Sequence, residues 1–253
     1  MNDFNRVFRT VICIFFASNL FFASDFRTEQ KRYPRVRTAY AEKEQEIKRW
    51  LAEKQIESFA VDIFIRVFKK EAVLEVWVKK KDDSRFLHLI DYAICDSSGT
   101  LGPKRKEGDL QVPEGCYHID RFNPASRFYL SLGINYPNRS DRIRGDEADP
   151  GSDVFIHGSC VTIGCVPITD DKIKELYVLA VEAKNSGQDK IPVHIFPVRM
   201  DDENFDEIKE EFSEEQKMLN FWEDLKPIYD HFEARKILPD VSINSRGLYV
   251  IGN

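Results

Sequence analysis

The segment 154–167 holds a histidine and a cysteine whose types and spacing suit acyl transfer. His157 is followed by Gly158, and Cys165 is preceded by Gly164. A thiol becomes a strong nucleophile when it loses its proton, and a neighbouring imidazole can accept that proton. Glycine before the cysteine lets the backbone bend sharply, which would turn the N–H groups of Gly164 and Cys165 toward a developing oxyanion. One loop could therefore supply the base, the nucleophile and the oxyanion donors.

A helix is predicted directly after this segment. Thr169 is a suitable N-cap, and Asp170 and Asp171 would lie in the first turn, where acidic side chains favour the helix dipole. Asn185-Ser186-Gly187 would end the helix. Apolar residues recur between these ends at helical spacing: Ile173, Leu176, Tyr177, Ala180 and Val181. A thiolate just ahead of such an N-terminus would be stabilised, so we expect a lowered pKa for Cys165.

At this point the residues resemble a known family. His157-Gly158 followed by Thr162-Ile163-Gly164-Cys165 is similar to the H-G … [S/T]-x-G-C signature of the L,D-transpeptidase catalytic domain, the YkuD-type domain of bacterial wall enzymes. The short gap between the two halves, and Cys160 within it, resemble the YafK-like branch, as do several runs that extend the similarity over nearly all of the mature chain. These runs include Val112-Pro113-Glu114-Gly115, Asn123-Pro124-Ala125-Ser126 and the stretch 130–138. The arginine that usually follows the cysteine by two positions is replaced by Pro167, so the substrate contact that the family's arginine would imply is not carried over.

The resemblance implies a reaction and a substrate. Cys165 would attack peptidoglycan stem peptides at meso-diaminopimelate and form a thioester, with His157 as base and no cofactor or metal. The carbonyl of Gly158 would hold the imidazole in the useful tautomer, and N–H groups around Gly164 would stabilise the oxyanion.

A polar, partly basic stretch lies ahead of the site, from which we expect Tyr136, Asn138 and Arg144 to contact substrate carboxylates. A solvated loop is the alternative for each of these three residues.

Other functions remain open from the sequence. The acyl acceptor decides between a transpeptidase and an L,D-amidase or endopeptidase, which would trim cross-links or release wall-linked lipoprotein. A wall-binding module with a structural or oxidised cysteine would perform no chemistry. A zinc site built from His157, Cys160, Cys165 and His194 is a further alternative, but these cysteines lack the C-x₂-C spacing of zinc knuckles.

Composition places the chain among globular proteins. Of its 253 residues, 42% are hydrophobic and 32% charged, and the formal net charge is −6. A net negative field repels phosphates, so a nucleic-acid partner is not expected. Basic and acidic residues alternate along most of the chain, which is typical of a mixed, solvated surface.

The N-terminus has the pattern of a secretory signal. Arg6 and Arg9 precede a short apolar run and small residues at Ala23 and Ser24. We therefore expect export to the periplasm or cell envelope and no membrane span after cleavage, with an uncleaved anchor as the alternative.

An oxidising compartment would tend to pair the cysteines of the mature chain. Cys160 and Cys165 share a loop, so a disulfide between them is hypothesised as an off switch. Cys95 and Cys116 lie in apolar runs and are expected to be buried as small hydrophobic residues.

The predicted fold is α+β with a mainly β catalytic domain, a mixed or antiparallel sandwich. Period-two patterns predict a hairpin over 59–79 and strands at 86–95, 116–119, 128–132, 154–156 and 191–198. Pro192 and Pro197 place the last of these at a sheet edge. After it, a helix is expected to end at Pro227, before a closing hairpin at 241–251. The predicted boundaries are 1–24 signal peptide, 25–56 helical brace, 57–198 catalytic domain and 199–253 helical extension with closing strands.

Overall fold

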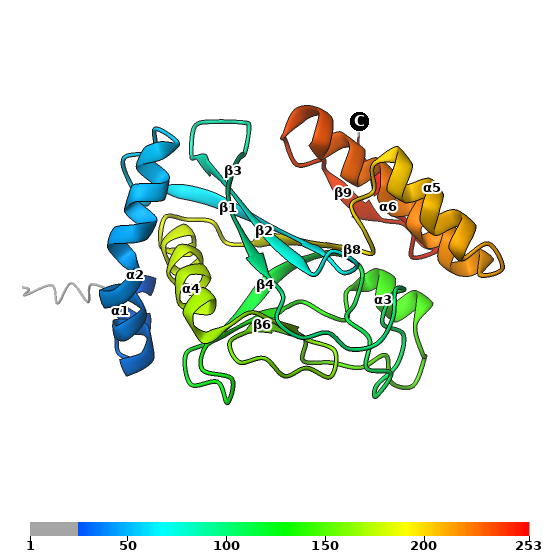
Figure 1. The fold of residues 1–253 in the computed structure, drawn as a ribbon, viewed down its shortest axis with the longest axis horizontal. Helices are drawn as coiled ribbons and strands as arrows, with labels where there is room; N and C mark the ends of the chain where they lie inside the picture. The colour runs from blue at the N-terminus through cyan, green and yellow to red at the C-terminus, as the bar shows by residue number, and fades with distance from the viewer. Residues whose placement is uncertain (1–24, 253) are drawn as a thin grey trace, which may run out of the picture.

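The computed structural model describes residues 25–252, and one mixed eight-stranded sheet lies at its centre (Figure 1). The strands follow the order β3-β2-β1-β8-β4-β5-β6-β7 across this sheet. In chain order the elements are α1 Phe26–Gln30, α2 Pro34–Glu53, β1 Val61–Phe68, β2 Val73–Lys80, β3 Leu87–Ala93, β4 Gly115–Asn123, β5 Ser131–Ile134, α3 Arg139–Arg144, β6 Phe155–His157, β7 Val166–Pro167, α4 Asp170–Asn185, β8 Ile191–Phe196, α5 Asp202–Glu211, α6 Gln216–Arg235, β9 Val241–Ile243 and β10 Tyr249–Ile251. The α+β class, the mixed sheet and the helices at both ends of the chain are thus confirmed, with the eight strands in one curled sheet.

The hairpin of β1 and β2 shows why both sheet faces are covered. Its antiparallel register runs from Val61 opposite Lys80 to Phe68 opposite Val73, as the alternating pattern predicted. Successive side chains point to opposite faces of a strand. Ile63 and Ile65 belong to the main core, whereas Phe64 packs in a separate cluster with Phe232 of α6. Apolar residues on both faces therefore require helices on both faces.

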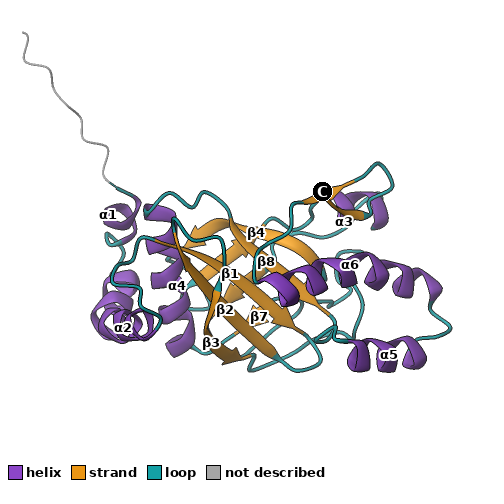
Figure 2. Cartoon of the chain, turned by 90° about the horizontal axis from the view of Figure 1, so that it is seen from above, coloured by secondary structure: helices purple, strands orange, loops and turns teal. Residues whose placement is uncertain are grey.

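Helices α1, α2 and α4 cover one face of the sheet, and α5 and α6 lie on the other side (Figure 2). Helix α4 begins after Thr169, whose side chain accepts from the Lys172 N–H as predicted. Buried polar contacts fix α2 against it: Lys43 Nζ lies 2.9 Å from Glu175 Oε1, and the Tyr40 hydroxyl donates to Glu182 Oε1 at 2.6 Å. Helix α4 is therefore held by the sheet on one side and by α2 on the other.

Helix α6 continues through Pro227 to Arg235, so the prediction that Pro227 ends it is wrong. Proline removes one backbone donor and disfavours a helix interior. Buried side chains lie on both sides of it, however: Phe221, Trp222, Leu225, Ile228, Tyr229 and Phe232. Packing of this face against the sheet outweighs the local preference.

Strand β8 is central, between β1 and β4, so its predicted place at an edge is also wrong. It pairs with β1 in parallel from Val193 to Phe196 and with β4 antiparallel from Ile191 to Ile195. Pro192 precedes the stretch paired with β1, and Pro197 follows the end of the strand. Pro192 also lies opposite His118 of β4, but the backbone N–H and carbonyl of His118 both bond to Asn135, so neither proline leaves a ladder hydrogen bond unmade.

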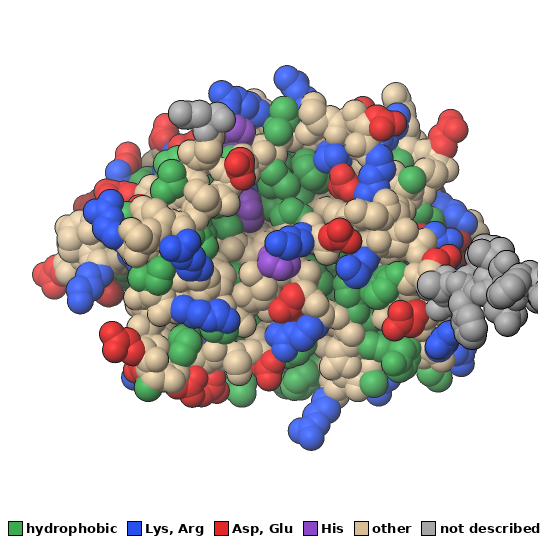
Figure 3. All heavy atoms as spheres, turned by 180° about the vertical axis from the view of Figure 1, so that it is seen from behind, with side chains coloured by type: hydrophobic (Ala, Val, Ile, Leu, Met, Phe, Trp, Pro, Cys, Tyr) green, Lys and Arg blue, Asp and Glu red, His purple; other side chains and the backbone are tan. Residues whose placement is uncertain are grey.

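The surface mixes charges of both signs, with basic, acidic and apolar side chains interspersed over the face in Figure 3. Within residues 25–252, no helix combines the length and apolar character that crossing a membrane requires. The predicted signal peptide at 1–24 lies outside the described residues.

Candidate active site

The short parallel pair of β6 and β7 sets the positions of the two predicted catalytic side chains. Ile156 lies opposite Val166, and His157 lies opposite Pro167. Because side chains alternate along a strand, this register predicts that Cys165, immediately before β7, is directed to the same side of the sheet as His157. The register would make the two residues diagonal neighbours at the edge of the sheet, since β7 is its last strand.

The His157 ring is buried and held by its own chain. Its Nδ1 lies 2.5 Å from the carbonyl oxygen of Gly158, and its ring stacks on Phe128 at 4.5 Å between centroids. A carbonyl only accepts, so Nδ1 carries the proton and Nε2 of the neutral ring is the available base. Burial lowers the pKa of His157, and the Gly158 hydrogen bond partly offsets this. The ring is thus neutral at physiological pH.

Gly158 is required by packing rather than by its dihedral angles. A Cβ at this position would lie 2.6 Å from Asp170 Oδ1 and 2.9 Å from the carbonyl oxygen of Phe128. Asp170, in the first turn of α4, accepts from the Ser159 N–H at 2.8 Å. The loop after His157 is therefore anchored to the helix that follows Cys165.

Cys165 is half-buried and lines a cavity of about 150 Å³ between the segment 94–101 and the end of β1. Its Sγ lies 3.8 Å from the carbonyl oxygen of Asp153, the acceptor that it meets in this resting arrangement. Burial raises the pKa of the Cys165 thiol, partly offset by a backbone hydrogen bond from Phe155. The side chain is therefore a neutral thiol facing a cavity.

The raised pKa of Cys165 is the opposite of the lowered pKa that was expected from the helix dipole. Helix α4 begins at Asp170, with β7 between it and the cysteine, and the Thr169 side chain already caps its first turn. The dipole effect falls off within one turn. Desolvation of the sulfur therefore outweighs it, and activation of the thiol depends on a base.

Thr162 holds the turn that carries Cys165. Its Oγ1 accepts from the Gly164 N–H at 3.1 Å and from the Cys165 N–H at 2.8 Å, and donates to the Cys165 carbonyl at 2.8 Å. Gly164 has a φ of +132°, where a side chain would be strained. The two N–H groups expected to bind an oxyanion are thus occupied by a hydroxyl. The T-x-G-C spacing, which suits a hydroxyl-to-backbone turn, was the signal for this role in the sequence.

The cysteine pairing differs from the hypothesis. Cys95 and Cys160 form a disulfide, while Cys165 and Cys116 are free. The hypothesised Cys160–Cys165 bond is therefore wrong, and so is the expectation that Cys95 is a buried free thiol. The residues that pair are 65 positions apart, and only the fold brings the end of β3 beside the loop that holds Cys160. Cys116 packs against the core around α6, and its burial raises its pKa.

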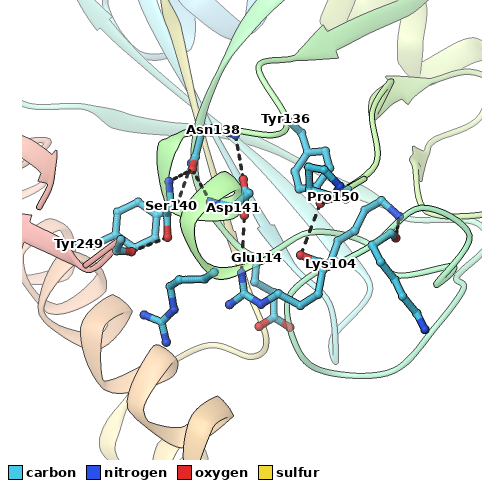
Figure 4. Close-up of polar contacts among 12 residues, drawn as sticks. Lys104, Glu114, Tyr136, Asn138, Ser140, Asp141, Pro150 and Tyr249 are labelled. Carbon is cyan, nitrogen blue, oxygen red and sulfur yellow. Dashed lines mark hydrogen bonds and ion pairs between the residues drawn. The ribbon is translucent and has the colours of Figure 1, made fainter. Parts of the chain in front are cut away.

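The three predicted substrate contacts lie in different surroundings, and two of them, Tyr136 and Asn138, are labelled in Figure 4. Tyr136 is buried and donates to the Pro150 carbonyl at 2.6 Å. Asn138 caps α3, and its Nδ2 donates to the carbonyl of Cys116 at 3.0 Å and to the Tyr249 hydroxyl at 2.9 Å. Arg144 bonds Asp224 at 3.0 Å and lines a second, larger cavity. Arg144 therefore faces space for a ligand, whereas Tyr136 and Asn138 are buried.

The side chains considered as zinc ligands are divided between separate places. Cys160 is in the disulfide, and His194 packs edge-on against Phe64 at 4.8 Å between ring centroids, in the core near α6. Among the residues that the structure describes, no group of three or more His, Cys, Asp or Glu side chains is arranged to hold a metal ion.

Comparisons with known proteins match the central part of the chain to one family. Residues 62–195 match the family described as the YkuD L,D-transpeptidase catalytic domain. The chain is 39% identical over 191 residues to the Escherichia coli K12 protein named "Putative L,D-transpeptidase YafK", which covers 75% of this chain and 73% of that protein. The protein of the same name from E. coli O157:H7 gives the same values.

Two solved structures resemble it more distantly. The helical cell shape determining protein Pgp2 from Campylobacter jejuni is 16% identical with a TM-score of 0.44, over 78% of this chain and 80% of that chain. Bdellovibrio bacteriovorus Bd1075 is 22% identical with a TM-score of 0.39, over 64% and 58%. The family match spans more than half of the chain, and the identity to the YafK proteins spans about three quarters of it. The chain therefore belongs to the family of YkuD L,D-transpeptidase catalytic domains.

Proposed function

We propose that this protein is an exported cysteine acyltransferase that acts on peptidoglycan stem peptides at meso-diaminopimelate. The observation that carries the proposal is the contact between His157 Nδ1 and the Gly158 carbonyl, which leaves Nε2 as a base on the same side of the sheet as Cys165. Membership of an L,D-transpeptidase family supports the reaction class and the substrate.

In the proposed first half-reaction, one proton moves from Cys165 to His157 and then from His157 to the leaving amine. The Cys165 thiol gives its proton to His157 Nε2 as sulfur attacks the amide carbonyl that follows the L-centre of diaminopimelate. The tetrahedral oxyanion displaces the Thr162 hydroxyl and accepts from the N–H groups of Gly164 and Cys165. When the C–N bond breaks, His157 returns the proton to the leaving amine, and a thioester remains on Cys165.

The second half-reaction releases the acyl group. An incoming amine from another stem peptide gives a transpeptide, whereas water gives a free carboxylate, and His157 accepts the proton in both cases. The enclosed position of Cys165 and its raised pKa support a mechanism in which the base acts only when substrate is bound.

Export is supported by the Cys95–Cys160 disulfide, because disulfides persist in oxidising compartments. Export and a role in the cell wall are both part of this proposal.

The test is incubation of the mature chain with purified muropeptides, with and without wall-linked lipoprotein, followed by mass spectrometry of the products. Cross-linked dimers support a transpeptidase, and loss of the terminal residue or release of lipoprotein supports a hydrolase. Unchanged muropeptides with wild-type protein, together with equal wall binding by Cys165→Ala, would establish a binding module instead. His157→Ala is the matched control, since it keeps the thiol and removes the base.

A further inference from the structure

A cavity of about 870 Å³ lies between the loop 100–111 and the first turns of α6. This volume is within the range of small-ligand sites in proteins. Its lining includes Leu101 and Met218 on the apolar side and Arg105, Gln111 and Arg144 on the polar side. The reaction steps described above leave this cavity without a role.

The cavity adjoins the catalytic cysteine. Thr100 and Leu101 line both this cavity and the smaller one that Cys165 lines. Two hydrogen bonds stabilise the ridge between the two cavities. Gln111 Oε1 accepts from the Thr100 N–H at 3.0 Å, and Gln111 Nε2 donates to Thr100 Oγ1 at 3.1 Å. The Gln111 carbonyl oxygen lies 3.1 Å from the position of a Cβ on Gly164. A peptide extending from the sulfur could therefore cross this ridge into the larger cavity.

Two arginines give the inner wall of the cavity its charge. The guanidinium groups of Arg105 and Arg144 both lie over the ring of Phe221, at 4.9 and 5.1 Å from its centroid. Arg105 Nη1 is buried and makes no hydrogen bond to the described residues, and its nearest carboxylate, Asp141 Oδ1, is 4.0 Å away.

Negative charge lies at the exposed rim of the cavity. Glu214 and Glu215 line the cavity at the start of α6 and are exposed, whereas Arg105 and Arg144 are only partly exposed. This gradient from inner cations to outer carboxylates suits a ligand end that carries both a carboxylate and an amine.

We propose that this cavity binds the free D-centre of meso-diaminopimelate, with its carboxylate at Arg105 and Arg144 and its amine toward Glu214 and Glu215. The proposal rests on the proposed function for the identity of the substrate. In this proposal, the interface between the catalytic domain and the C-terminal helices selects diaminopimelate over residues that lack the second carboxylate.

The test compares two synthetic stem tetrapeptides that differ only in their third residue, meso-diaminopimelate or L-lysine. Lysine keeps the amine and lacks the carboxylate. Calorimetry on the full mature chain with Cys165→Ala measures binding without turnover. We expect the diaminopimelate peptide to bind about ten-fold more tightly, because a charge-assisted hydrogen bond contributes about that factor. Adding Arg144→Gln should remove the preference.

Asp224→Asn is the matched control. It removes the ion pair between Arg144 and α6 but keeps the arginine, so the preference should persist if the cavity binds the carboxylate. Loss of the preference in both variants would assign the effect to displaced α6 and overturn the proposal. Equal binding of the two peptides to the parent chain would overturn it without any arginine variant.

The same peptides separate this proposal from the proposed function. Thioester formation on wild-type Cys165 without any preference between the peptides would contradict the cavity assignment alone. A preference that Arg144→Gln abolishes, without any thioester on the wild-type chain, would support the cavity and contradict the acyltransferase.

Discussion

The imidazole of His157 is fixed by the carbonyl of its neighbour Gly158, 2.5 Å from Nδ1. This bond uses one ring nitrogen and leaves the other for chemistry. Because burial lowers the pKa of the ring, the imidazole of His157 loses its proton below the ordinary histidine pKa. Burial also raises the pKa of Cys165, so the free enzyme holds a neutral pair rather than a thiolate–imidazolium pair.

A pH profile tests this resting state. We expect the acidic limb of kcat/KM to have its midpoint below the ordinary histidine pKa of about 6.5, since activity needs neutral His157. Iodoacetamide should label Cys165 slowly at pH 7 and faster only above the ordinary thiol range, about 8.5. Rapid labelling at neutral pH, lost in His157→Ala, would instead indicate a preformed ion pair.

Thr162 should position the nucleophile. Thr162→Val removes three hydrogen bonds within the Cys165 turn, so we expect kcat to fall about ten-fold while KM changes little. Thr162→Ser keeps the hydroxyl and should stay within about two-fold of the wild type. Steady-state kinetics on a stem peptide measure both. Loss of activity in Thr162→Ser, with wild-type activity in Thr162→Val, would show that the methyl group, not the hydroxyl, matters.

The Cys95–Cys160 disulfide should stabilise the fold. It closes a loop of 65 residues, so the double variant Cys95→Ser, Cys160→Ser should lose about 4 kcal/mol in unfolding free energy. Urea denaturation measures this, and wild-type protein with reductant is the control. Non-reducing peptide mapping should recover the 95–160 pair. A peptide joining Cys160 to Cys165 would contradict the pairing described here.

Asp141 should make stability depend on pH in an unusual direction. Its folded pKa of about 6 lies above the ordinary value, because burial outweighs its hydrogen bonds from Asn138 and Tyr117. The folded state therefore keeps the proton longer, and stability from this group is complete below about pH 4 and declines as pH rises through 6. We expect Asp141→Asn to gain on the order of 2 kcal/mol relative to wild type between pH 4 and 7.

Denaturation of both chains across that pH range provides the measurement. The informative quantity is the difference in unfolding free energy between the two chains, because the pKa values of other carboxyl groups shift in the usual direction. The pKa of Glu75, for example, is lowered by Arg66 despite burial. A difference that stays constant from pH 4 to 7 would contradict the role of Asp141.

Local features of the fold were predictable from the sequence, and contacts between distant segments were not. The cap at Thr169 and the β1–β2 hairpin depend on residues close in the chain, and both were predicted. The central place of β8 depends on pairing with β1 and β4, which Pro192 obscured.

The site divides in the same way. The positions of His157 and Cys165 follow from a short motif, and the carbonyl partner of the ring was expected from resemblance. The raised pKa of Cys165 follows from burial by segments far away in sequence, including 94–101. Phe128, which stacks on His157, was predicted only as part of a strand.

The most direct test of the central claim is intact-protein mass spectrometry of the mature chain after brief exposure to a diaminopimelate stem peptide. The account predicts a mass increase equal to the acyl portion of the peptide, located on Cys165 by peptide mapping and reversed by hydroxylamine. His157→Ala should form this adduct much more slowly, and Cys165→Ala not at all. An adduct on another residue, or release of cleaved peptide by Cys165→Ala at the wild-type rate, would contradict the account.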